Sequence, residues 1–184
     1  TLSLHDALPI WQSQISEWLN DDTGAKASIT PVWMLYVPNT YNLGAGFLYG
    51  IDPRVKKYIQ TANVKWVAGY SSEYTQGQLY TTQQKVFLLS MKEMSFNIQT
   101  DEGDVTDLYD EYTNSNLTNN AVAARAKYNK AGGTLNTYRW SRSAYSGRAG
   151  NSRFVTSTGA HSNGSAVGAY YYAPAFIFGK SGIA

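Results

Sequence analysis

The chain has 184 residues, of which 43% are hydrophobic, 15% are charged and 14% are aromatic. This length suits a single domain, and the aromatic content supplies a core and excludes a disordered chain. The absence of cysteine excludes disulfides, thiolate metal sites and cysteine nucleophiles, and a net charge of +2 is too small to indicate a nucleic-acid-binding protein.

The first ten residues, Thr1 to Ile10, match codon for codon the translation of a short-read sequencing adapter. We therefore exclude this segment from fold reasoning, and with it His5 and Asp6 from every catalytic argument. On this interpretation the natural N-terminus lies elsewhere, and we expect N-terminal strands of the domain to be missing. We expect one N-terminally truncated domain over residues 11–179 and a short tail over residues 180–184.

Two short helices are predicted in the first third of the chain. Residues 11–19 place Trp11, Ile15, Trp18 and Leu19 on one face at helical spacing. A second helix is predicted to start at Asp52 and Pro53, because Asp is a good N-cap and Pro fits the first helical position. Between them, Gly44, Gly46 and Gly50 indicate turns and close packing rather than a phosphate-binding loop, since no strand–loop–helix pattern surrounds them.

The remaining predicted elements are mostly short strands. Apolar runs and alternating patterns predict strands at residues 32–37, 63–68, 85–89, 138–140, 153–156 and 173–178. Pro174 marks a strand start or a sheet edge. Residues 69–84 are rich in Tyr, Ser, Thr and Gln and are predicted to form a surface loop. Ser90 and Glu93 have capping-box spacing, which predicts a helical turn after the third strand.

Charge is divided unevenly along the chain. Residues 1–111 hold 7 basic and all 13 acidic residues, whereas residues 112–184 hold 8 basic residues and no acid. Six of the acids, Asp101, Glu102, Asp104, Asp107, Asp110 and Glu111, form one cluster. This cluster could bind calcium or supply a glycosidase carboxylate pair. Its spacing fits no EF-hand loop, so a solvated acidic loop is the favoured interpretation.

Outside the adapter-like segment the single histidine is His161, which lies in a turn-like sequence, Thr158–Gly164. A Ser-His-Asp triad needs an acid to orient the imidazole, and the nearest acid on the chain, Glu111, lies fifty residues from His161. Zinc or non-haem iron catalysis normally needs two or more imidazole ligands. We therefore expect an exposed His161, no cofactor and no metal site.

The C-terminal third combines arginines with aromatic residues. Arg139, Arg142, Arg148 and Arg153 alternate with Tyr138, Trp140 and Tyr145. Such a composition occurs in nucleic-acid-binding proteins, but no recognisable binding motif accompanies it. We favour pairing of these arginines with the acidic cluster and stacking on the aromatic rings.

The segment Ser141–Tyr172 has an unusual composition. Its 32 residues include 7 Ser, 5 Gly, 4 Tyr and 2 Asn. Binding loops of antibodies use the same residues, because Tyr supplies broad contact area at low entropy cost and small polar residues adapt their hydrogen bonds. Ordinary β-hairpin loops explain this composition equally well, so composition alone leaves both interpretations open.

Several short segments, spread over nearly the whole chain, carry a family resemblance. In the N-terminal half these are Glu17–Asn20 (EWLN), Gly46–Asp52 (GFLYGID) and Lys85–Glu93 (KVFLLSMKE). In the C-terminal half they are Trp140–Ser143 (WSRS), Val155–Gly159 (VTSTG) and Ala173–Phe176 (APAF). Together they resemble the bacterial and phage family called domain of unknown function 6273, over about Trp11 to Phe178. The WWLRSP segment frequent in that family is altered here, since Tyr138–Ala144 lacks the second Trp and the Pro.

This resemblance implies an α+β fold of the C-type-lectin-like kind, with two short helices, a twisted antiparallel sheet and long loops. Similar folds occur in formylglycine-generating enzymes and in variable receptor-binding proteins of phages. The enzyme branch uses cysteines or several histidines, which this chain lacks. The resemblance therefore favours a binding protein over an enzyme.

The sequence thus predicts a non-enzymatic ligand- or receptor-binding domain of a phage tail or bacterial surface protein, located on a virion or at the cell surface. The predicted recognition residues are Tyr145, Arg148, Asn151, His161, Asn163, Tyr170 and Tyr171. Trp140, Phe154, Phe176 and Phe178 are predicted to be core.

The predicted partner is a host cell-surface protein or glycan, with no nucleic acid and no membrane insertion, and a homo-oligomer through missing regions is left open. The alternatives are a hydrolase that uses the carboxylates of residues 101–111 and a purely structural module.

Overall fold

The computed structural model describes residues 14–25, 44–69, 75–94, 96, 98, 138–145, 151–165 and 170–179. Strands dominate this part of the chain. The helices are α1 (Gln14–Asn20) and α3 (Pro53–Lys56). The strands are β1 (Ile59–Gln60), β2 (Ala62–Val67), β3 (Leu79–Gln84), β4 (Phe87–Leu88), β5 (Arg139–Ala144), β6 (Asn151–Val155), β7 (His161–Ser165), β8 (Pro174–Ala175) and β9 (Ile177–Phe178). The predicted α+β class with two short helices is confirmed at this level.

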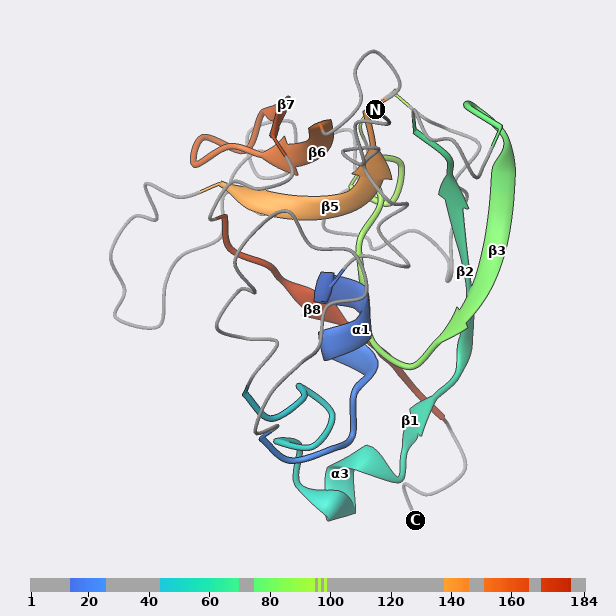
Figure 1. Ribbon diagram of the computed structural model, residues 1–184, viewed down its shortest axis with the longest axis vertical. Helices are drawn as coiled ribbons and strands as arrows, with labels where there is room; N and C mark the ends of the chain where they lie inside the picture. The colour runs from blue at the N-terminus through green and yellow to red at the C-terminus, as the bar shows by residue number, and fades with distance from the viewer. Residues whose placement is uncertain are drawn as a thin grey trace, which may run out of the picture.

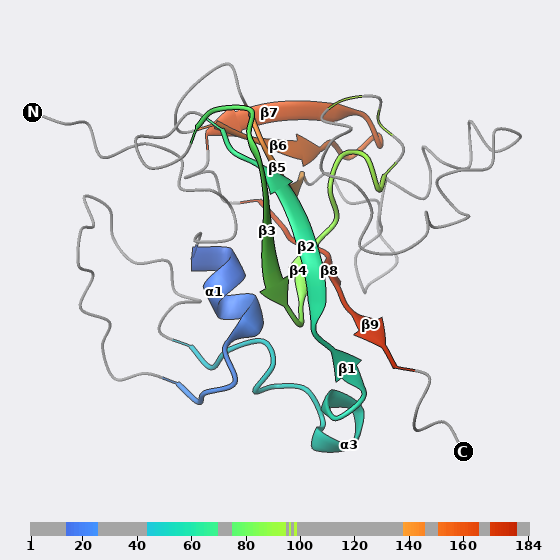
Figure 2. The same ribbon diagram turned by 90° about the vertical axis from the view of Figure 1, so that its right-hand side faces the viewer.

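The described strands form small antiparallel sheets. The three-stranded sheet has the order β5-β6-β7, and the two-stranded sheets pair β1 with β9, β2 with β3 and β4 with β8. In Figure 1 the β5-β6-β7 sheet lies at one end of the molecule and α3 at the other, with the long β2–β3 hairpin along one side. Figure 2 shows α1 beside this hairpin.

One apolar cluster joins elements from both ends of the chain. Its buried members are Leu19, Leu48, Ile59, Val86, Leu88, Trp140 and Phe154. Burying each such large side chain contributes roughly 1.5–3 kcal/mol relative to leaving it exposed. The cluster therefore fixes the C-terminal sheet, through Trp140 and Phe154, against the N-terminal helix and β4. The prediction that these two residues are core is confirmed.

Both helices follow their sequence signals. The side chain of Asp52 accepts a hydrogen bond from the backbone amide of Arg54 at 2.8 Å, and Pro53 occupies the first turn of α3, as predicted. Helix α1 overlaps the predicted range of residues 11–19 and ends one residue beyond it, at Asn20; it buries Leu19 and packs Ile15 and Trp18 against the core. Trp11 and the strand predicted at residues 32–37 lie outside the described residues.

The prediction of a surface loop over residues 69–84 is wrong at its C-terminal end, because residues 79–84 form β3. Tyr80, Thr81 and Thr82 are aromatic or β-branched and favour extended backbone, although the segment is polar. Gly77 permits the turn back from β2, since its φ is 78°. Its amide donates to the carbonyl of Ala68 at 2.9 Å, while the Ala68 amide donates to Gln78 at 2.9 Å. This is the pattern of a β-bulge with glycine in the left-handed region.

The structure also corrects the end of the chain. Of the sequence Thr158–Gly164, predicted as a turn, only the first part turns, at Gly159 with a φ of 81°, and β7 begins at His161. The single strand predicted over residues 173–178 is split into β8 and β9, with Pro174 at a strand start as predicted. Phe178 is 49% exposed and is not core, because β9 pairs only with the short β1 at the edge of the described fold.

Candidate functional site

The outward side of β6 and β7 carries a row of polar side chains. Alternation along β6 directs Ser152 and Phe154 inward, so Asn151 and Arg153 share the opposite side. The register pairs Asn151 with Ser165, Arg153 with Asn163 and Val155 with His161. We define the polar face as Tyr145, Asn151, Arg153, His161 and Asn163.

Two contacts organise one end of the polar face. The amide nitrogen Nδ2 of Asn151 donates to Oδ1 of Asn163 at 3.1 Å, across the two strands. The guanidinium carbon of Arg153 lies 5.2 Å from the ring centroid of Tyr145, within the range of a cation–π contact. Asn163 is exposed, while Tyr145, Asn151 and Arg153 are half-buried. This end therefore offers amide, guanidinium and aromatic groups that are already oriented.

At the other end of the polar face, His161 is exposed, as its position in the chain predicted. Its ring contacts the edge of Phe96 at 5.2 Å between centroids. Neighbouring Val155, on the partner strand, packs with Met91 and Met94. The polar face thus ends against a small apolar cluster that covers this end of the sheet.

Tyr170 and Tyr171 lie away from the polar face. The segment that contains them runs along the free edge of β5, where the amide of Trp140 donates to the carbonyl of Tyr171 at 2.9 Å. Tyr170 is half-buried on the inward side, with ring centroids 4.6 Å from Trp140 and 4.8 Å from Phe154. Tyr171 is 56% exposed. The structure therefore places these two predicted site residues on a different surface, and Arg148 lies outside the described residues.

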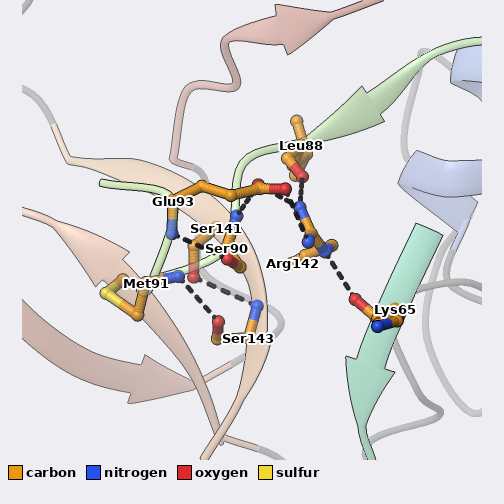
Figure 3. Close-up of polar contacts among 8 residues, drawn as sticks. All are labelled: Lys65, Leu88, Ser90, Met91, Glu93, Ser141, Arg142 and Ser143. Atoms are coloured by element: carbon orange, nitrogen blue, oxygen red, sulfur yellow. Dashed lines mark hydrogen bonds and ion pairs between the residues drawn. The ribbon is translucent and has the colours of Figure 1, made fainter. Parts of the chain in front are cut away.

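Behind the polar face, a buried ion pair joins β5 to the turn after β4 (Figure 3). Arg142 and Glu93 are 4% and 2% exposed. Nη1 and Nη2 of Arg142 both bind the Glu93 carboxylate, the second at 2.9 Å. The same guanidinium donates to the carbonyls of Lys65 at 2.7 Å and Leu88 at 3.0 Å. One side chain thus holds β2, β4 and β5 together.

Glu93 also completes the capping box that the sequence predicted. Its carboxylate accepts from the amide of Ser90 at 2.8 Å, and Ser90 Oγ accepts from the amide of Glu93 at 3.0 Å. The Ser90–Glu93 spacing therefore predicted the turn correctly, but it did not predict that Arg142 also binds the Glu93 carboxylate. The expectation that Arg142 pairs with the acidic cluster is wrong, because its acid is Glu93.

Serine hydroxyls of β5 connect this buried network to the polar face. Ser143 Oγ accepts from the amide of Met91 at 2.9 Å. Ser141 Oγ donates to the carbonyl of Arg153 at 3.0 Å, directly behind the polar face. The backbone that presents Arg153 is therefore fixed from behind by hydrogen bonds as well as by Phe154.

A small hollow lies beside the buried pair. The hollow beside Arg142 is lined by Ile15, Ser16, Leu19, Val64, Trp66, Gln84 and Leu88. It has room for about one water molecule. The contacts of Arg142 with Glu93, Lys65 and Leu88 connect separate strands of the fold.

The acidic cluster at residues 101–111 lies outside the described residues. Among the residues that the structure describes, no three acidic, histidine or cysteine side chains gather as metal ligands. No helix in the described ranges is long and apolar enough to span a membrane.

The segments that carry the family resemblance contact one another. Asn20 Oδ1 accepts from the amides of Lys85 at 2.8 Å and Val86 at 3.1 Å, and Asn20 Nδ2 donates to the Val86 carbonyl at 2.8 Å. A Cβ atom at Gly46 would overlap the carbonyl of Asp21, so close packing requires glycine there. These segments build the frame, and the polar face lies largely between them in the sequence.

Sequence reasoning did not include Arg153 in the predicted site. The signal was available, since Asn151 and Arg153 are two positions apart in a strand and so share a side. Asn163 lies beside Asn151 and Arg153 because β7 pairs with β6 in this register. The sequence pattern did not predict that β7 is a strand.

The comparisons with known proteins give one match. The family model described as Domain of unknown function (DUF6273) matches residues 11–179. No curated protein matches the chain, and no solved structure matches it.

Proposed function

The chain belongs to the domain of unknown function 6273 family, and from this premise we propose that it is a non-enzymatic ligand-binding domain with a C-type-lectin-like fold. Recognition takes place on the polar face, with Arg148, Tyr170 and Tyr171 contributing from neighbouring segments. The partner is a protein or glycan on the surface of a host cell. The domain acts as part of a phage tail or a bacterial surface protein.

The observation that supports this proposal is the pre-organised end of the polar face. Tyr145, Arg153, Asn151 and Asn163 are oriented by mutual contacts before any ligand arrives. Fixing side chains in advance lowers the entropy lost on binding. Amide and guanidinium groups donate hydrogen bonds to hydroxyl, carbonyl or carboxylate oxygens, and the tyrosine ring supplies contact area.

The surrounding sequence also favours binding. No Asp or Glu occurs between residues 112 and 184, so the segment that carries the polar face holds basic side chains and no acidic ones. The side chains of the polar face project from a sheet whose own residues Trp140 and Phe154 pack into the main apolar cluster. A rigid scaffold that presents variable polar groups is a common basis of recognition.

The experiment that tests the proposal is a binding screen of the fluorescently labelled chain on a glycan array and on a panel of intact bacterial cells. We expect binding to at least one surface, and we expect Arg153→Ala and Asn163→Ala to weaken it by roughly tenfold or more each. Asn63→Ala is the matched control, because Asn63 is an exposed polar residue of β2, in another sheet.

Two results would contradict the proposal. The first is binding that both substitutions on the polar face leave unchanged. The second is turnover of a glycan or peptide by the purified chain, which would favour a hydrolase.

A further inference from the structure

The outer edge of β3 is open in the described fold. The strand pairs in unbroken register with β2, from Leu79 opposite Val67 to Gln84 opposite Ala62. Within the described residues no strand pairs with its other side. Figure 1 shows β3 as the outermost labelled strand on its side of the molecule.

The hydrogen-bond pattern identifies which groups face outward. The Ala68 amide donates to the carbonyl of Gln78. In an antiparallel ladder every second residue pair is hydrogen-bonded. In this register the backbone groups of Tyr80, Thr82 and Gln84 therefore form hydrogen bonds with β2. The amides and carbonyls of the intervening residues therefore point to the open edge. These are Leu79, Thr81 and Gln83.

This edge lacks the usual protection. Natural sheets block open edges with lysine, proline, bulges or very short strands. β3 has six residues, its sequence, LYTTQQ, contains neither a charge nor a proline, and the bulge at Gly77 lies before the strand begins. Its outward side chains are exposed, including the apolar Leu79. An edge with these properties favours addition of another strand.

We propose that β3 pairs antiparallel with β3 of a second copy of this chain, about a twofold axis at Thr81. Pairing must join residues whose backbone groups face outward, which sets Thr81 opposite Thr81 and Leu79 opposite Gln83. On the other side of the sheet, Tyr80 then faces Thr82, an aromatic–β-branched pair of the kind that stabilises sheets.

A second copy suits this edge for two reasons. The strand is uncharged, so two copies meet without repulsion. In addition, a two-stranded ribbon is only marginally stable by itself, and the pairing converts two such ribbons into one four-stranded sheet. A twofold axis makes the contact self-complementary and closed, which prevents growth into a fibre.

The test is analytical ultracentrifugation of the full 184-residue chain over a range of concentrations, with two opposite charge variants. We expect a concentration-dependent dimer in the unsubstituted chain. Thr81→Lys and Thr81→Glu each place like charges opposite one another at the axis, and we expect each to raise the dissociation constant by roughly tenfold or more. An equimolar mixture of the two variants restores the dimer, because Lys then faces Glu.

Asn63→Lys is the matched control, because Asn63 is exposed on β2 opposite Gln83, one strand away from the open edge. We expect this variant to dimerise like the unsubstituted chain. A chain that stays monomeric at all concentrations would overturn the proposal. So would dimers that Thr81→Lys leaves intact, or a mixture that does not dimerise more strongly than either variant alone.

Discussion

Glu93 and Arg142 are 49 positions apart in the sequence and form a buried ion pair with two contacts between guanidinium and carboxylate. Remaining donors of Arg142 bind backbone carbonyls of β2 and β4, and the carboxylate also caps the turn at Ser90. Each charge thus has several partners, which offsets the cost of removing it from water. The pair connects the acidic N-terminal part of the chain to its basic C-terminal part.

Removing one member of this pair should destabilise the fold strongly. Arg142→Met leaves a buried carboxylate without its counter-charge, and we expect a loss of about 3–5 kcal/mol in the free energy of unfolding. Urea denaturation followed by tryptophan fluorescence measures the change. Arg54→Met is the control, because its ion pair with Asp52 is exposed and contributes little. A similar loss in both variants would contradict the role assigned to Arg142.

Asn20 is expected to be nearly as sensitive. Asn20→Ala leaves backbone groups at Lys85 and Val86 without their side-chain partner, at a cost of about 1–3 kcal/mol. Asn20→Asp keeps the acceptor oxygen and removes the donor, so its loss should be smaller than that of the alanine variant. Equal stability of Asn20→Ala and the unsubstituted chain in urea denaturation would refute this assignment.

These two sites show how far the sequence could predict the fold. The Ser90–Glu93 capping box and the Asp52–Pro53 helix start involve residues within a few positions of each other, and both were predicted correctly. The partners of Glu93 and Asn20 lie 49 and about 65 positions away, and no local pattern reveals them. Hydrophobic periodicity predicted the first helix and several of the strands, whereas the α+β class was what the family resemblance implied.

The errors have a similar origin. β3 and β7 are polar and were predicted as a loop and a turn, because hydrophobic alternation is the main signal for a strand. Their strand character comes from pairing with β2 and β6, which tertiary structure supplies. For the same reason the contact between Asn151 and Asn163 could not be predicted.

Gly77 is expected to contribute to stability through the backbone conformation of the turn between β2 and β3. Its φ of 78° is strained for any residue with a Cβ, while the space around a Cβ there is open. Gly77→Ala should therefore destabilise through the backbone alone, by about 1–2 kcal/mol. Gly50→Ala is the control, since a Cβ there makes only ordinary contact with the Phe47 carbonyl. Thermal unfolding of the two variants should rank Gly50→Ala as the more stable one.

Asp52 should give a small, pH-dependent contribution to stability. The hydrogen bond from the Arg54 side chain, followed by that from the Arg54 amide, lowers the pKa of the Asp52 carboxyl below its ordinary value. A lowered pKa stabilises the fold above the unfolded-state value and loses this effect as the pH falls through the folded-state value.

Asp52→Asn keeps a capping oxygen but does not titrate. The unsubstituted chain should therefore be more stable than this variant near neutral pH, and the difference should shrink below a pH of about 4. Urea denaturation at several pH values measures the difference. A difference that grows toward acid would contradict the assigned sign.

The separation between Glu93 and Arg142 also sets an order of events during synthesis. A ribosome delivers the carboxylate and its capping turn well before it delivers the arginine, since residue 93 leads residue 142 by 49 positions. Until then, burial would leave the acid without its counter-charge, so it stays in water. We therefore expect the core around Glu93 to pack only after β5 has been synthesised. A nascent chain that stalls before β5 should leave this part of the core exposed to water.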